Sequence, residues 1–216
     1  NKNRYITLFT SGTTGTPKGV MLSYYNLFSR INANKKYINF SKIQNVLVIL
    51  QLSFGHGLIG NALTALFSKK NIFLINIYNM QYLNKFSEII KKNNINFFCT
   101  VPSQIKQIMM FSKKLKNSNL KLIHIGSAPV SLSLLYKISK WSNIENIFNM
   151  YGITEASNWI AGKKYNKKNK IDFNIGKAWS GKIRVMINNK IVSSGFGEVL
   201  IKSNSVFTKY FKLPNT

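Results

Sequence analysis

The chain has 216 residues, 45% of them hydrophobic, which is enough to build a packed core. Its net charge of +26 comes from 31 basic and five acidic residues, and the basic residues are scattered along the sequence. This distribution argues against a specific nucleic-acid reader, and the single cysteine, Cys99, argues against a disulfide-stapled secreted domain. A positive field would still favour an anionic small ligand.

The first segments predict a strand, a glycine-rich loop and a helix. "YITLF" (5–9) has the apolar run of a short buried strand, and "GVMLS" (19–23) is expected to be extended. Between them, "TSGTTGTPKG" (10–19) combines glycines, hydroxyl side chains and one lysine. Because Ser23 is a favoured N-cap residue, a helix is predicted over 24–37.

Apolar strands and amphipathic helices then alternate. Strands are predicted at 45–50, 71–76, 96–101 and 120–126, and helices at 58–69, 81–92, 103–116 and 132–141. This alternation is typical of βαβ units, so the expected fold class is α/β with a mostly parallel sheet. The uncharged stretch 46–67 is long enough for a membrane span, but its polar residues and central glycines favour a buried strand, a turn and a helix.

The pattern changes near residue 170. Residues 182–203 predict antiparallel strands, and Asn188-Asn189 suits a two-residue hairpin turn because asparagine tolerates positive φ. A boundary is expected at 171–176, which divides the chain into an α/β body (1–172) and the start of a small β subdomain (173–216). The lysine-rich run 163–170 is expected to be a solvated loop.

The loop at 10–19 has the chemistry of a phosphate site. Its glycines can turn backbone N–H groups inward, its hydroxyls add donors, and Lys18 supplies a positive charge. The common NTPase loop places its lysine between a glycine and a serine or threonine, whereas Lys18 stands between Pro17 and Gly19. A kinase or P-loop ATPase is therefore disfavoured.

The longer stretch "FTSGTTGTPKGVMLS" (9–23) resembles the phosphate loop of the adenylate-forming (AMP-binding) superfamily, which includes acyl-CoA synthetases, luciferases and adenylation domains of nonribosomal peptide synthetases. Further stretches follow in that family's order. "GSAP" (126–129) resembles the turn beside adenine, and "YGITEAS" (151–157) resembles the second signature. "GEVLIKSNSVFTKYFKLPNT" (197–216) resembles the Gly-Glu strand and the tyrosine-containing segment after it.

The resemblance implies a set of site residues. Those expected to contact the nucleotide are Thr10, Ser11, Gly12, Thr13, Thr14, Gly15, Gly126, Ser127, Ala128, Pro129, Tyr151 and Gly152. The implied catalytic residues are Lys18, Thr154 and Glu155, and Glu155 is also the expected ligand of Mg²⁺. A carboxylate oxygen suits this hard cation, and Glu155 is one of only five acidic residues.

The substrate pocket is expected to involve Phe54, His56 and Trp159. In "LQLSFGHGLIG" (50–60), Gln51 replaces the proline of the Leu-Pro-Leu-x-His or Leu-Pro-Leu-x-Phe stretch of many relatives. His56 is interpreted as a packing or gating histidine and not as a catalytic base. Trp159 keeps two interpretations, pocket lining or packing. Amino-acid-activating domains often carry Phe-Asp where this chain has Phe54-Gly55, which favours an acid without an α-amino group.

The resemblance implies an AMP-forming acid–thiol ligase of acyl-CoA synthetase type. The complete enzyme would use a carboxylic acid, ATP and Mg²⁺, with coenzyme A or a carrier-protein thiol as acyl acceptor, in the cytoplasm and in fatty acid metabolism. Two alternatives stay open: an adenylation domain of a peptide synthetase, and a truncated nucleotide-binding relative without catalysis. Because the family's Thr-Gly-Asp signature and C-terminal lysine domain have no counterpart here, the chain is expected to be an internal piece, inactive alone.

Overall fold

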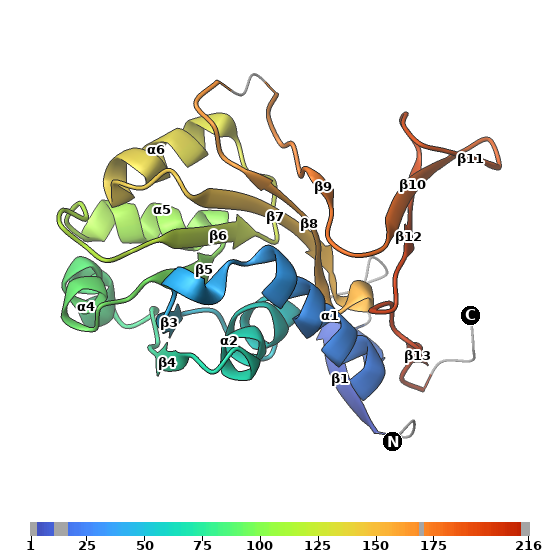
Figure 1. Cartoon of the computed structure of the whole chain (residues 1–216), viewed down its shortest axis with the longest axis horizontal. Coiled ribbons are helices and arrows are strands. Elements are labelled where there is room, and N and C mark those ends of the chain that lie inside the picture. The colour runs from blue at the N-terminus through green and yellow to red at the C-terminus, as the bar shows by residue number, and fades with distance from the viewer. Residues whose placement is uncertain (1–3, 11–16, 169–170, 213–216) are drawn as a thin grey trace.

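The computed structural model describes residues 4–10, 17–168 and 171–212 (Figure 1). Its centre is a seven-stranded sheet. The strands lie in the order β4 (Asn71–Leu74), β3 (Asn45–Val48), β5 (Phe97–Thr100), β6 (Leu122–Gly126), β7 (Ile147–Ile153), β8 (Asn158–Lys164) and β9 (Lys177–Ala178). Neighbouring strands from β4 to β7 run parallel, and β8 and β9 are added antiparallel. The expected mostly parallel sheet is therefore confirmed.

The four strands predicted at 45–50, 71–76, 96–101 and 120–126 are present as β3, β4, β5 and β6, each shorter than predicted. The strands β8 and β9 were missed. The prediction of a solvated loop at 163–170 was wrong at its start, because Lys163 and Lys164 end β8 and Tyr165 is buried.

The helices follow the predicted order with different bounds. They are α1 (Tyr24–Tyr37), η1 (Phe40–Lys42), η2 (His56–Leu63), α2 (Thr64–Phe67), α3 (Met80–Asn84), α4 (Phe86–Lys92), α5 (Pro102–Phe111), α6 (Leu132–Ser142) and η3 (Thr154–Ala156). The Ser23 cap of α1 is confirmed, since its hydroxyl accepts a hydrogen bond from the Asn26 N–H over 3.2 Å.

Three helix predictions needed correction. The helix at 81–92 is two helices, because Lys85 leaves the helical conformation (φ −92°, ψ 8°). The helix predicted at 103–116 ends at Phe111. The next residue, Ser112, has an extended backbone, and its hydroxyl donates a hydrogen bond to the Ile108 carbonyl oxygen. The helix at 58–69 begins as the π-helix η2, whose Gly57 packs so closely on residue 51 that a Cβ would lie 2.4 Å from the Gln51 carbonyl oxygen.

Alternate residues of the central strands face opposite layers, as the period of a strand requires. Phe98 of β5 joins a cluster with α3, α4, α5 and α6, whereas Phe97 and Cys99 join a second cluster with α2 and the residue after α1. Helices thus cover both faces of the parallel strands, which explains why these strands are apolar without alternation.

Two small antiparallel sheets complete the fold. One joins β1 (Tyr5–Thr10), β2 (Lys18–Ser23) and β13 (Lys209–Tyr210), and the other joins β10 (Lys182–Ile187), β11 (Lys190–Val192) and β12 (Glu198–Lys202). Asn188 and Asn189 have φ of 47° and 60°, so the predicted hairpin turn is confirmed. The second sheet stands apart from the main sheet (Figure 1). The division at residues 172 and 173 stays a prediction.

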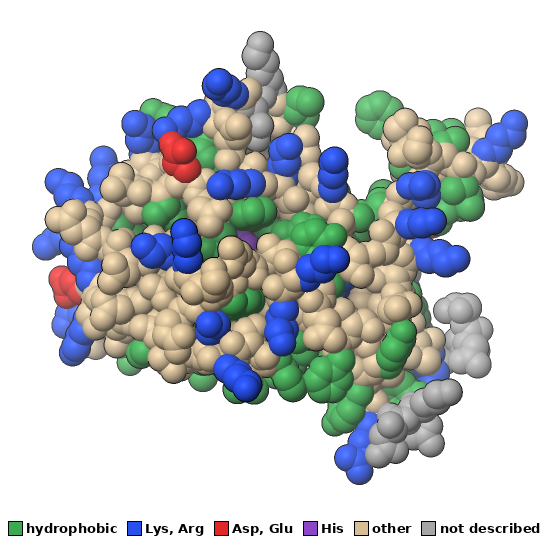
Figure 2. All heavy atoms as spheres, in the orientation of Figure 1, with side chains coloured by type: hydrophobic (Ala, Val, Ile, Leu, Met, Phe, Trp, Pro, Cys, Tyr) green, Lys and Arg blue, Asp and Glu red, His purple; other side chains and the backbone are tan. Residues whose placement is uncertain are grey.

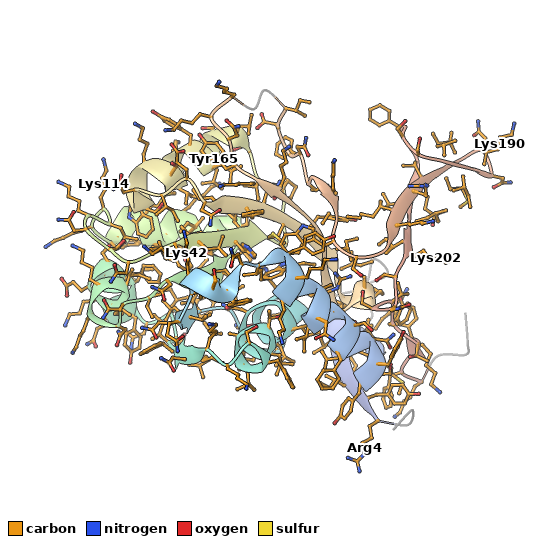
Figure 3. All side chains as sticks on the ribbon, in the orientation of Figure 1. Arg4, Lys42, Lys114, Tyr165, Lys190 and Lys202 are labelled. Atoms are coloured by element: carbon orange, nitrogen blue, oxygen red, sulfur yellow. The ribbon has the colours of Figure 1, made fainter. Side chains whose placement is uncertain are left out.

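On the face that Figure 2 shows, the basic side chains of the described residues are spread out and do not gather in one patch. Lys42, Lys114, Lys190 and Lys202, for example, project outward from separate parts of the chain (Figure 3). Within the described ranges, no helix has both the length and the apolar character to cross a bilayer. The uncharged stretch 46–67 instead contributes to β3, η2 and α2.

Candidate nucleotide and acid site

A two-stranded hairpin holds both ends of the loop that the sequence assigns to phosphate. Thr10 lies opposite Lys18 at the end of the β1–β2 ladder, and the Thr10 hydroxyl donates to the Lys18 carbonyl oxygen over 3.5 Å. Loop residues Ser11, Gly12, Thr13, Thr14 and Gly15 lie outside the described residues. Their phosphate contacts therefore stay predictions.

A cavity of about 320 Å³ lies at the carboxyl ends of β6 and β7. Its lining includes the predicted nucleotide residues Ser127, Ala128, Pro129, Tyr151 and Gly152. Since β6 and β7 are parallel neighbours, residues from both strand ends meet at one edge of the sheet.

The turn after β6 requires close backbone packing. A Cβ on Gly126 would lie only 2.5 Å from the Met150 carbonyl oxygen, so glycine allows the two strand ends to approach. Phe173 and Ile175 add apolar surface to the same cavity. The result is a recess suited to a flat, largely apolar ring.

A second cavity of about 370 Å³ adjoins the first, and Ser127 and Gly152 line both. The predicted residues Phe54, His56 and Thr154 line it. Its remaining lining residues are Leu50, Gln51, Gly55, Gly57, Tyr78, Val101, Ile153 and Asn158. Among the described residues none of the lining side chains is charged, although the chain carries a net charge of +26.

His56 links the two cavities. Its Nδ1 lies 2.8 Å from the Ser127 hydroxyl, so the residue at the start of η2 contacts the turn beside the first cavity. Burial lowers the pKa of His56 to about 3. The imidazole is therefore neutral near pH 7, which suits the packing interpretation and not a charged role.

Trp159 lies behind the second cavity, not in its lining. It is 2% exposed on β8, and its ring meets His56 edge-to-face with centroids 5.3 Å apart. The Trp159 ring also meets that of His124, with centroids 4.8 Å apart. We call His56, His124 and Trp159 the aromatic wall. Of the two interpretations of Trp159, its position fits packing.

Lys18, Glu155 and Tyr210 meet at a charged corner next to the second cavity. The Tyr210 hydroxyl donates to Glu155 Oε1 over 3.1 Å, and the Lys18 Nζ lies 5.7 Å from the centre of the Tyr210 ring. Burial, followed by the nearby Glu155 carboxylate, raises the pKa of Tyr210, so the phenol keeps its proton. Sequence reasoning assigned Lys18 and Glu155 to the site but missed Tyr210.

Hydrogen bonds from distant elements hold the segment that carries Tyr210. The Asn26 amide of α1 donates to the Asn204 and Val206 carbonyl oxygens over 3.0 and 2.7 Å. The Ser157 hydroxyl donates to the Ser205 carbonyl oxygen over 2.7 Å, and the Phe207 N–H donates to the Glu155 carbonyl oxygen over 2.6 Å. This segment is therefore fixed against both α1 and the second signature.

Buried Arg30 adds to this attachment. Its guanidinium donates to the Trp179 carbonyl oxygen over 2.9 Å and to the Ser205 hydroxyl over 2.5 Å. Burial lowers its pKa to about 10, and no acidic side chain in the described part of the chain pairs with it. The sequence offered no signal for this residue, because its partners lie about 150 residues or more away.

The Glu155 carboxylate is the kind of oxygen ligand that Mg²⁺ prefers. The described residues contain no group of three or more His, Cys, Asp or Glu that could hold a metal ion. Mg²⁺, however, is commonly held by one or two carboxylates together with substrate phosphates. One Glu155 oxygen accepts the Tyr210 hydroxyl, and the second receives no hydrogen bond from the described residues.

Comparison with known proteins identifies the class. The model of the AMP-binding enzyme family matches residues 2–211, so the chain belongs to that family. Bacitracin synthase 2 from Bacillus licheniformis is 27% identical over 69% of this chain and 6% of its own length. 4-Coumarate–CoA ligase-like 2 from Arabidopsis thaliana is 27% identical over 95% of this chain and 37% of its own length.

A solved structure confirms the fold. ATP-bound MatB from Rhodopseudomonas palustris superposes with a TM-score of 0.80 and 24% sequence identity. The match covers 96% of this chain and 41% of MatB. The chain thus spans less than half the length of each of these three proteins.

Proposed function

We propose that the protein carrying this chain joins a carboxylic acid to a thiol through an acyl-adenylate made from ATP. The observation that carries the proposal is the pair of adjoining cavities that share Ser127 and Gly152. The first cavity, beside Tyr151, suits adenine, and the second cavity, beside Phe54, suits an acyl group. We call the second cavity the acid cavity. Thr154 lines it, and Glu155 is the next residue, so the second signature lies where the two cavities adjoin.

In the first step, a carboxylate oxygen attacks the α-phosphorus of ATP. The bond from this phosphorus to the bridging oxygen breaks, and pyrophosphate leaves with the electron pair. Because both reactants are anions, positioning and charge neutralisation are the main requirements. Lys18 supplies a positive charge, and bound Mg²⁺ would neutralise phosphate charge. The acid is already ionised, so His56 has no proton to remove.

In the second step, a thiol sulfur attacks the acyl carbonyl carbon. The bond to the AMP oxygen breaks, AMP leaves with the electron pair, and the thiol proton passes to solvent. The match to a CoA ligase-like protein supports coenzyme A as the thiol. A carrier-protein thiol is the second candidate acceptor.

The lining of the acid cavity supports an acid with an uncharged tail. A distal carboxylate would need a cationic partner to offset its desolvation, and the described lining residues carry no charge. Gly55 follows Phe54, whereas amino-acid-activating domains often carry an aspartate after this phenylalanine to bind the substrate amine. We therefore favour a monocarboxylic acid without an α-amino group.

A peptide-synthetase adenylation domain is the second candidate function. The 27% identity to bacitracin synthase 2 favours it. The choice of acid separates the two candidates, since the second predicts turnover with an amino acid in place of a simple monocarboxylic acid.

ATP–pyrophosphate exchange tests the proposal in the complete natural polypeptide that contains these residues. We expect exchange that depends on Mg²⁺ and on an added acid. Glu155→Ala should reduce it by roughly 100-fold or more, on the scale of losing one transition-state electrostatic contact. Glu88→Ala, which changes an exposed glutamate on α4, is the matched control. No exchange with any acid or amino acid would refute the function, and undiminished exchange in Glu155→Ala would refute the metal assignment.

A further inference from the structure

Tyr210 holds an unusual position between the two charged residues of the site. Its hydroxyl donates to Glu155, and its ring lies beside the Lys18 ammonium. The three residues come from β13, η3 and β2, which are far apart in the sequence. Nothing in the proposed chemistry uses the tyrosine itself.

The backbone around Tyr210 is fixed on two sides. Tyr210 pairs with Val20 and Lys209 with Met21 in the β2–β13 ladder. The N–H of Phe211 donates to the Gly19 carbonyl oxygen over 2.6 Å, and the Tyr210 ring packs on Phe207 with centroids 4.6 Å apart. The hydroxyl therefore reaches Glu155 from a rigid support.

We propose that Tyr210 is a positioning residue for Glu155. Its hydroxyl fixes one carboxylate oxygen, so that the second oxygen faces the metal ion of a bound metal–nucleotide complex. This inference rests on the proposed function, because it assigns Glu155 to the metal.

The direction of the hydrogen bond supports this role. The Tyr210 phenol donates to the Glu155 carboxylate, and a charge-assisted bond of this kind is stronger than one between neutral groups. A side chain held in this way loses less rotamer freedom when the metal binds. Without the hydroxyl, the carboxylate would have to be ordered at the moment of binding.

Binding of Mn²⁺ with ATP, followed by electron paramagnetic resonance, tests the proposal without turnover. Tyr210→Phe keeps the ring beside Lys18 and the packing on Phe207 but removes the hydroxyl. We expect the Mn²⁺–ATP dissociation constant to rise roughly three- to tenfold, the size of a typical net hydrogen-bond contribution. Binding of metal-free ATP should change less than twofold. A merely structural tyrosine would weaken both alike.

Tyr136→Phe is the matched control. Tyr136 on α6 also has a lysine ammonium beside its ring, with Lys140 Nζ at 5.5 Å from the centroid. In the described chain its hydroxyl donates to no carboxylate, so this change should leave Mn²⁺–ATP binding as in the wild type.

Equal Mn²⁺–ATP affinity in Tyr210→Phe and wild type would overturn the positioning role. Absence of Mn²⁺–ATP binding in the wild type would overturn the proposed nucleotide site itself, and the metal role of Tyr210 with it.

Discussion

The aromatic wall and the charged corner flank the same cavity but are built in opposite ways. His56, His124 and Trp159 are buried and uncharged, and they meet through edge-to-face ring contacts. Lys18, Glu155 and Tyr210 are half-buried, and polar contacts join them.

The difference separates stability from function. The aromatic wall continues the core cluster on one face of the main sheet, so it shares the hydrophobic stabilisation of the fold. The charged corner lies at the surface, where individual polar contacts contribute little to stability. Substitutions in the aromatic wall should therefore lower the stability of the fold. Substitutions in the charged corner should lower activity and leave stability nearly unchanged.

Trp159→Ala should give the largest loss of stability. Truncating a fully buried aromatic side chain removes its packing and leaves a cavity, which costs about 3–5 kcal/mol. Denaturant unfolding measures this loss. Phe196→Ala, at a side chain that is 100% exposed, is the control and should change stability by less than about 0.5 kcal/mol. A small loss in Trp159→Ala would mean that the aromatic wall is not part of the core.

Low pH should give the second-largest loss of stability, through the buried His56 of the aromatic wall. Burial holds the pKa of folded His56 at about 3, below its ordinary 6.5. As the pH falls below 6.5, the unfolded chain binds a proton that the folded chain refuses, so the free energy of unfolding falls until about pH 3. His56 alone should remove about 1.6 kcal/mol of the free energy of unfolding between pH 6.5 and pH 5.

The pH dependence of stability in His56→Gln isolates this contribution. Its slope below pH 6.5 should be shallower than in the wild type, whatever the variant's stability at pH 7. Part of the slope should remain, because burial and the neighbouring His56 also lower the pKa of His124. Identical slopes would show that folded His56 takes up a proton near its ordinary pKa.

Glu155→Gln should have the smallest effect on stability. The glutamine oxygen can still accept the Tyr210 hydroxyl, so the free energy of unfolding should change by less than about 1 kcal/mol. Thermal or denaturant unfolding measures it beside Trp159→Ala. A loss as large as that of Trp159→Ala would remove the contrast between the two regions.

Local signals in the sequence predicted much of this fold. Ser23 starts α1, the asparagine pair 188–189 turns the β10–β11 hairpin, and apolar runs mark β3 to β6. Each feature depends on residues close together in the chain. The family resemblance likewise singled out the segments at 126–129 and 151–155, and the structure then places them at one edge of the main sheet.

The missed features depend on distant contacts. β8 pairs antiparallel with β7 after a turn in which Ser157 and Asn158 adopt positive φ of 56° and 98°. Neither residue is a glycine, so the sequence carried no sign of this turn. Trp159 was open to two interpretations because burial behind His56 is a tertiary property. Tyr210 was missed because only the β2–β13 ladder brings it to Glu155.

The β2–β13 ladder also dictates when the site can appear during synthesis. Val20 pairs with Tyr210. A ribosome that adds about 5–20 residues per second synthesises Tyr210 many seconds after Val20, so this pair can form only late in synthesis. A nascent chain that has grown only through β12 already contains every strand of the main sheet, yet Glu155 lacks its tyrosine. All strands of the main sheet are thus synthesised before the last residue of the charged corner.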